Sequence, residues 1–159
     1  MEDEDRIPTI PPPPHGFEAT ADRHETVSYP RPSHKDGRGV ITNLHHGALE
    51  HVAIITSLKG AVRAEHWHPG TNVQRMYLVS GRYLVRSVPL DGQGRPVGDV
   101  CEFMVEAGGL TETGPYIGHA YLFQEDSVFL NLNSSGRDPG GYGIHTLPLA
   151  SALFQGGRR

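Results

Sequence analysis

Hydrophobic residues occur along this chain in short runs that are separated by turn-forming residues. Eight runs rich in Val, Ile, Leu, Tyr and Phe follow one another in the sequence: 39–44, 51–57, 61–66, 73–80, 82–90, 100–107, 119–124 and 127–133. Glycine, proline, asparagine or aspartate bounds each run. Many short strands with turn signals between them are typical of a β-sandwich or β-barrel, so the pattern predicts an all-β domain.

Helical periodicity is weak by comparison. No run keeps apolar residues at the spacing of an amphipathic helix, and the best helix candidate is short, at residues 147–154. Among all-β architectures, the double Greek-key jelly roll accommodates this many short strands and encloses a pocket. The expected fold is therefore a single jelly-roll barrel.

The start of the chain has a different composition. Residues 7–16, IPTIPPPPHG, are rich in proline, which lacks a backbone donor and has a fixed φ. Such a segment is excluded from helices and central strands and favours an extended, polyproline-like conformation. We therefore divide the chain into a proline-rich N-terminal arm, residues 1–33, and a β domain, residues 34–159.

Length and charge limit the class of protein. The chain has 159 residues, which suits one domain with a real core, and its formal net charge is −4. No Lys/Arg run is longer than two residues, which argues against nucleic-acid partners and polybasic membrane binding. No apolar run approaches the ~20 residues of a membrane span, and the acidic start MEDEDRIP does not resemble a secretory signal. We expect a cytoplasmic protein, and its single cysteine, Cys101, excludes an internal disulfide.

Two histidines one residue apart are the first candidates for chemistry. Alternate residues of a strand point to the same face, so His66 and His68 in AVRAEHWH are expected to project together. Gln74 opens the next strand-like run, and His119 opens another much further along the chain. An antiparallel barrel can bring these four side chains into one mouth. Imidazole binds Zn, Fe, Cu, Ni and Mn, and an amide oxygen is a weaker ligand, so both a metal and a substrate remain possible occupants.

The spacing of these residues resembles the cupin superfamily. Its first motif, G-x5-H-x-H-x3,4-E-x6-G, and its second, G-x5-P-x-G-x2-H-x3-N, are matched in order between residues 60 and 123. The matched positions are Gly60, His66, His68, Gln74, Gly81, Gly109, Pro115 and His119. The chain departs from the motifs at Gln74, which replaces the acid after a longer gap, at Gly118 and at Phe123. The resemblance implies the cupin jelly roll and a homodimer.

A narrower resemblance concerns cupins that act on nucleotide-linked keto sugars. KDGRGVITNL is similar to their D-x-R-G segment, and GAVRAEHWH is similar to their G-x-x-R-x-x-H segment. By resemblance to the dTDP-4-keto-6-deoxysugar 3,5-epimerases and 3,4-ketoisomerases, His66 and His68 are candidate base and acid, and Arg63 is a candidate substrate contact. Asp36 and Arg38 are weaker candidates for nucleotide contact. In a regular strand Arg63 and His66 face opposite sides, so a bulge or a strong twist is required if both line one pocket.

Proton transfer is chemically reasonable for such a site. A proton beside a ketone is acidic enough for a histidine base, and a second histidine or a tyrosine can return it. Tyr121 shares strand parity with His119 and is the preferred tyrosine, with Gln74 and His119 as further substrate-binding candidates. The first hypothesis is therefore an epimerase or ketoisomerase that acts on a nucleotide-activated keto sugar or a similar carbonyl compound.

Two alternatives stay open. A metal-dependent cupin, an oxygenase, isomerase or lyase acting on a small acid or natural-product intermediate, would bind a divalent transition metal (Fe, Zn, Mn or Ni). Its ligands would be His66, His68, Gln74 and His119. A non-catalytic, ligand-binding cupin is favoured by the missing acid and the missing asparagine of the two motifs.

Overall fold

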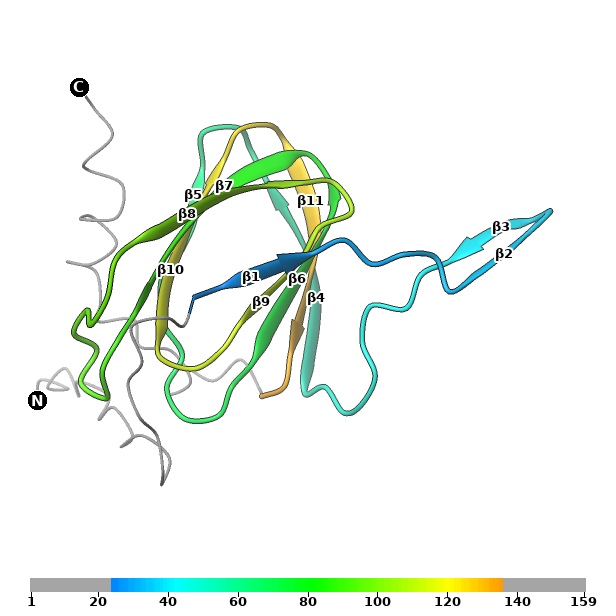
Figure 1. The fold of residues 1–159 in the computed structure, drawn as a ribbon. Coiled ribbons are helices and arrows are strands. Elements are labelled where there is room, and N and C mark those ends of the chain that lie inside the picture. Colours follow the sequence, from blue (N-terminus) through cyan, green and yellow to red (C-terminus); the bar gives the residue numbers. More distant parts are fainter. Residues whose placement is uncertain (1–23, 136–159) are drawn as a thin grey trace, which may run out of the picture.

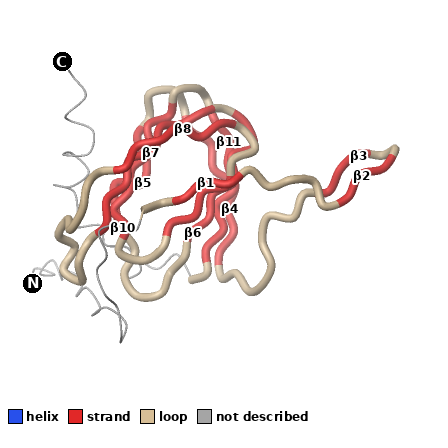
Figure 2. The backbone as a smooth tube through the Cα atoms, viewed as in Figure 1, coloured by secondary structure: helices blue, strands red, loops and turns tan. Residues whose placement is uncertain are grey.

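The architecture is entirely β in a computed structural model that describes residues 24–135 (Figures 1 and 2). This part of the chain contains eleven strands and no helix. Their bounds are β1 Thr26–Ser28, β2 His34–Asp36, β3 Gly39–Ile41, β4 His51–Ser57, β5 Val62–His66, β6 Gln74–Ser80, β7 Arg82–Pro89, β8 Cys101–Glu106, β9 Leu110–Thr113, β10 Ile117–Phe123 and β11 Ser127–Asn133. The described residues contain no helix that is long and apolar enough to cross a membrane.

Two antiparallel sheets form the barrel. The larger sheet has the strand order β1-β9-β6-β11-β4, and the smaller one has the order β5-β10-β7-β8. Non-consecutive strands are neighbours in both sheets, as expected when Greek-key connections cross the ends of a jelly roll. The predicted all-β jelly-roll fold is confirmed.

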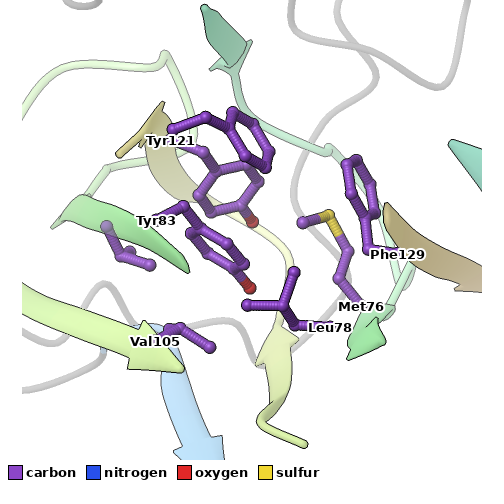
Figure 3. Packing of buried hydrophobic residues seen from close by; sticks show 8 residues of the cluster. Met76, Leu78, Tyr83, Val105, Tyr121 and Phe129 are labelled. Atoms are coloured by element: carbon purple, nitrogen blue, oxygen red, sulfur yellow. The ribbon is translucent and has the colours of Figure 1, made fainter. Parts of the chain in front are cut away.

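The core fills the space between the two sheets. Alternate residues of β6 and β7 are buried, because one face of each strand points inward. The central cluster draws Met76, Leu78 and Phe129 from the larger sheet (Figure 3). Tyr83 and Tyr121 of the smaller sheet face them, with ring centroids 5.2 Å apart. Side chains of both sheets thus meet in one apolar interior.

A tight turn connects β6 to β7. Gly81 has a φ of 94°, and a Cβ atom there would lie 2.1 Å from the Ser127 Oγ. Only glycine combines this backbone conformation with so close an approach. The last glycine of the first motif is therefore explained by the turn that starts β7.

The observed strands differ from the predicted ones in the N-terminal region and at β9. Strand β1 lies within the predicted arm, where it pairs antiparallel with β9 at the edge of the larger sheet. Neither strand was predicted, because Thr26–Ser28 and Leu110–Thr113 are short and carry few apolar residues. The predicted helix at 147–154 and most of the predicted arm lie outside the described residues.

A two-stranded hairpin stands apart from the barrel. Strands β2 and β3 pair only with each other and project away from the two sheets (Figure 1). Val40 and Ile41 on this hairpin are 55% and 57% exposed. Asp36 is the last residue of β2, and Arg38 lies in the turn between β2 and β3.

Candidate active site

A bulge in β5 puts two chemically important residues on the same side of the sheet. In the pairing of β5 with β10, His66 lies opposite His119 and Ala64 lies opposite Ala120. His119 and Ala120 are consecutive, so Glu65 is an extra residue on β5. Ala64 and Glu65 have φ values of 66° and 56° in the left-handed region. The bulge needed to bring Arg63 and His66 to the same side of the sheet is therefore present, and both residues line one cavity.

The side chains of the three predicted histidines and of Gln74 lie close together. Among the described residues, His66, His68 and His119 form a group whose ligand atoms all lie within 4.8 Å of one another. The Nε2 atoms of His66 and His68 are 3.3 Å apart, and the His68 Nε2 is 2.8 Å from the Gln74 Oε1. His68 and His119 are buried. The structure thus brings together residues from β5, β6, β10 and the loop after β5.

Asn131 on β11 extends this group and was not predicted. The Gln74 Nε2 donates a hydrogen bond of 3.0 Å to the Asn131 Oδ1, which turns the Gln74 Oε1 toward His68. Because an amide oxygen only accepts, the His68 Nε2 carries the proton in that contact. The same proton faces the His66 Nε2, which therefore presents a lone pair. The alternation of SVFLNLN places Asn131 on the inward face of β11, and this was the available signal.

The His119 ring is held by a hydrogen bond to a backbone carbonyl group. Its Nδ1 donates to the Ile117 carbonyl at 2.9 Å, which leaves the Nε2 as the unprotonated nitrogen. The Nε2 is buried and has no hydrogen-bond partner within the described residues. Burial, and then the charges of His66 and His68, lower the pKa of His119 well below its usual value. This ring is thus a neutral acceptor aimed into the group.

A small cavity of about 80 Å³ adjoins the histidines. Its polar lining consists of Arg63, His66, Gln74, Tyr121 and Asn131, and apolar side chains of the core complete it. The exposed Arg63 guanidinium donates to the Ser57 Oγ and the Thr56 carbonyl. The cavity therefore combines proton-transfer groups, hydrogen-bonding amides and one cation.

Tyr121 is paired with a carboxyl group that sequence reasoning missed. The Tyr121 hydroxyl donates to the Glu25 Oε1 at 2.7 Å, and both side chains are buried. Burial raises the pKa of Glu25 to about 7. Glu25 lies in the predicted arm, directly before β1, so nothing in the sequence pattern indicated that it is buried.

Asp36 and Arg38 lie away from the cavity. The Arg38 side chain and backbone both bond to the Asp36 carboxylate, with a shortest contact of 2.6 Å from the Arg38 Nη2. These hydrogen bonds lower the pKa of Asp36 to about 2. Since both residues belong to the projecting hairpin, one chain does not bring them to its own histidine group (Figure 1).

The histidine group also fits a transition-metal ion. His119 presents a bare Nε2 while its Nδ1 is anchored to a carbonyl, which is how metal-binding histidines are commonly oriented. His66, His68 and the Gln74 oxygen would complete a neutral ligand set. Neutral nitrogen donors suit Zn, Fe, Mn or Ni, although the amide adds no negative charge.

Similar folds occur among enzymes that modify nucleotide-linked sugars. A 3,4-ketoisomerase from Thermoanaerobacterium thermosaccharolyticum, in complex with TDP-4-keto-6-deoxyglucose, matches with a TM-score of 0.61 and 17% identity over 82% of this chain and 96% of that one. The chain has the jelly-roll fold of these enzymes. A 3'-monoepimerase from Streptomyces bikiniensis, in complex with dTDP-quinovose, shares this jelly-roll fold with a TM-score of 0.61 and 20% identity over 79% of this chain and 71% of that one.

The likeness extends to an epimerase from Mycobacterium tuberculosis, with a TM-score of 0.60 and 16% identity over 77% of this chain and 69% of that one. No protein-family model matches the sequence. No curated protein is significantly similar to it either. At these identities the likeness shows the jelly-roll fold and no more.

Proposed function

We propose that this protein is an enzyme that transfers a proton beside the carbonyl group of a nucleotide-activated keto sugar, as an epimerase or a ketoisomerase. The observation that carries the proposal is the bulge in β5, which places Arg63 and His66 on one cavity with Tyr121. A base, an acid and a cation then line one cavity. The neighbours in complex with TDP-4-keto-6-deoxyglucose and dTDP-quinovose support the substrate class.

His66 is the base in this proposal. Its Nε2 presents a lone pair, because the facing His68 Nε2 already donates its proton to Gln74. Taking the proton from the carbon beside the ketone onto the His66 Nε2 produces an enolate and a His66 imidazolium, while His68 keeps its own proton in the hydrogen bond to Gln74. A positioned histidine base contributes about 10²–10⁴ in rate.

Tyr121 returns a proton to the sugar, and Arg63 binds its anionic part. The Tyr121 ring lines the same cavity as His66, and the exposed Arg63 guanidinium lies where a diphosphate can reach it from solvent. A planar guanidinium pairs well with phosphate oxygens. In this proposal the nucleotide part of the substrate stays outside the cavity, bound by Arg63, and the sugar enters the cavity beside His66 and Tyr121.

A metal-dependent cupin enzyme is the second candidate. It is favoured by the convergence of three imidazoles with ligand atoms within 4.8 Å and by the bare His119 Nε2. When bound, Fe, Zn, Mn or Ni would supply a Lewis acid that polarises a substrate oxygen. His66, His68, Gln74 and His119 would hold it. Elemental analysis of the purified protein distinguishes this candidate from the first.

We also propose that the protein is a homodimer of the cytoplasm. Val40 and Ile41 of the projecting hairpin and Val52 and Ile54 of the edge strand β4 are more than half exposed. Exposed apolar side chains and an unpaired sheet edge are surfaces that a second copy of the chain can cover. The hairpin, isolated in one chain, gains a packing partner in such a dimer.

The test of function is turnover of TDP-4-keto-6-deoxyglucose by the wild type and by single variants. His66→Asn is expected to lower kcat about 10²–10⁴-fold, because an amide cannot act as the base, and His68→Asn is expected to lower it as well, because it removes the ring that faces the His66 Nε2. His46→Asn removes an exposed loop histidine and serves as the matched control. Equal activity of His66→Asn and the control would overturn the proposal.

A further inference from the structure

Glu25 is a buried carboxyl group that lies outside the histidine group. It is 3% exposed and sits directly before β1, at the edge of the larger sheet. Its Oε1 accepts from the Tyr121 hydroxyl at 2.7 Å, while its Oε2 is buried without a hydrogen-bond partner in residues 24–135. The Glu25 N–H lies 3.4 Å from the Ser87 Oγ on β7. Tyr121, its partner, lines the cavity with His66.

The surroundings of Glu25 contain hydroxyl groups and no paired cation. Tyr121 on β10 and Tyr83 on β7 are the titratable groups that face it, and Thr111 and Thr113 of β9 add two hydroxyls. No Lys or Arg of the described residues forms an ion pair with it. His24 is adjacent in sequence, and His119 lies beyond Tyr121, with ring centroids 5.4 Å apart. A buried carboxylate without a cation is costly, so the neutral acid is a natural state for this group.

The protonation of Glu25 decides the direction of its hydrogen bond to Tyr121. A carboxylate only accepts, so it holds the phenolic proton on its own side. A neutral carboxyl group can donate to the phenol oxygen instead, which leaves the phenolic proton free for another acceptor. We propose that Glu25 is the positioning residue that controls whether Tyr121 can give its proton to the substrate. This inference rests on the proposed function.

The proton balance is complete without any further reagent. Tyr121 gives its proton to the carbanionic carbon, and the neutral Glu25 carboxyl group stabilises the phenolate that forms by donating a hydrogen bond to it. His66 holds the proton taken from the substrate and releases it to solvent, and the Tyr121 phenolate regains one from solvent after the product leaves. Each turnover therefore ends with both groups in their starting states.

Two observations on acidity agree with this arrangement. Burial raises the pKa of Glu25 to about 7, so that near neutral pH both forms are present. Burial, followed by the charge of Glu25, also raises the pKa of Tyr121 and of Tyr83, which keeps both phenols protonated. The carboxyl group is thus the member of this cluster that changes state between mildly acidic and mildly alkaline solution.

The kinetic test compares pH profiles of TDP-4-keto-6-deoxyglucose turnover. In the wild type, kcat is expected to fall about tenfold per pH unit above about pH 7, as Glu25 ionises. Glu25→Gln keeps a neutral donor at every pH, so its kcat is expected to change by less than about threefold between about pH 7 and 9. Glu102→Gln, a carboxyl-to-amide change at the exposed pair with Arg86, keeps the wild-type profile. A Glu25→Gln profile that falls with the wild-type slope would overturn the inference.

A spectroscopic test is independent of the substrate and of the folding of the Glu25 variant. The tyrosine doublet in Raman spectra reports whether a phenol donates or accepts its hydrogen bond. The wild-type minus Tyr121→Phe difference spectrum is expected to change from acceptor to donor as the pH rises through about 7. A difference spectrum with the same character on both sides would overturn the inference. If the wild type turns over no TDP-keto sugar, the proposed function fails, and this spectrum still decides the role of Glu25.

Discussion

Which nitrogen of each imidazole carries a proton determines what the cavity can do. His119 is fixed by the Ile117 carbonyl, and His68 is fixed by the Gln74 oxygen, which Asn131 orients in turn. The His66 Nε2 is therefore the unprotonated nitrogen of the His66–His68 pair. The amide at position 74 therefore favours proton transfer, since a carboxylate there would add the negative charge that a divalent ion prefers.

Replacing the amide by an acid is expected to strengthen metal binding. Gln74→Glu adds one negative charge beside three imidazoles without a large change in shape. Calorimetric titration with Ni²⁺ or Zn²⁺ should show affinity about tenfold or more above that of the wild type. Gln93→Glu places the same charge on an exposed loop and is the control. Equal affinities of the two variants would show that the Gln74 oxygen is not directed at the histidine group.

Glu25 makes stability depend on pH in a defined direction. Its pKa in the folded protein, about 7, is above its ordinary value of 4.5, so the folded state holds the proton more tightly. The stabilisation is complete below about pH 4.5 and is lost as the pH rises through 7, amounting to roughly 3 kcal/mol. Urea unfolding at both ends of this window should show the loss in the wild type and not in Glu25→Gln. A Glu25→Gln variant that loses the same free energy would contradict the assignment.

At the scale of single elements, the bulge in β5 links local strain to the site. Two consecutive non-glycine residues, Ala64 and Glu65, adopt positive φ so that Arg63 and His66 share a face. Left-handed conformations cost such residues about 1 kcal/mol or more each. The strain is confined to the point where the site needs an extra residue, as is common for β-bulges beside functional sites.

Relieving this strain with glycine should stabilise the protein. Ala64→Gly is expected to raise the free energy of unfolding by up to about 1 kcal/mol, because glycine adopts positive φ at no steric cost. Ala53→Gly, in the middle of β4, should instead lower it by roughly 0.5–1 kcal/mol. Chemical unfolding of both variants measures the difference. Destabilisation of the same size by both changes would mean that Ala64 carries no strain.

The sequence allowed the elements around the histidines to be predicted well and the N-terminal ones poorly. Strands such as His51–Ser57 and Ser127–Asn133 have strong apolar patterns, and the conflict between Arg63 and His66 pointed to the bulge in advance. Strand β1 could not be found this way, because three residues after a proline-rich segment carry no periodic signal. Glu25 was missed for the same reason, since its burial depends on contacts with β7, β9 and β10 that only the folded chain creates.

At the scale of the whole molecule, the projecting hairpin is the surface that a second copy of the chain would cover in the proposed dimer. Asp36 and Arg38 neutralise each other at its tip and cannot reach the cavity of their own chain. A second copy offers the exposed apolar side chains of β4 as a surface to pack against. In the proposed dimer the hairpin is therefore a contact between subunits.

Polar substitutions on the hairpin should separate the subunits without unfolding the barrel. The double variant Val40→Ser and Ile41→Ser removes two exposed apolar side chains from a hairpin whose strands pair only with each other. Sedimentation should give about 35 kDa, twice the 17.4 kDa of one chain, for the wild type and the mass of one chain for the variant. Val97→Ser, at an exposed site on another loop, is the control. A wild type that sediments as a single chain would contradict the proposed dimer.

The central claim is that His66 and Tyr121 move a proton at a carbon beside a ketone. The most direct measurement is proton NMR of TDP-4-keto-6-deoxyglucose incubated in D₂O with protein from which metals have been removed by chelation. The account predicts that deuterium enters beside the ketone with the wild type and that His66→Asn reduces its rate about 10²–10⁴-fold. Exchange that is absent from the chelated protein and returns only with added metal would contradict it.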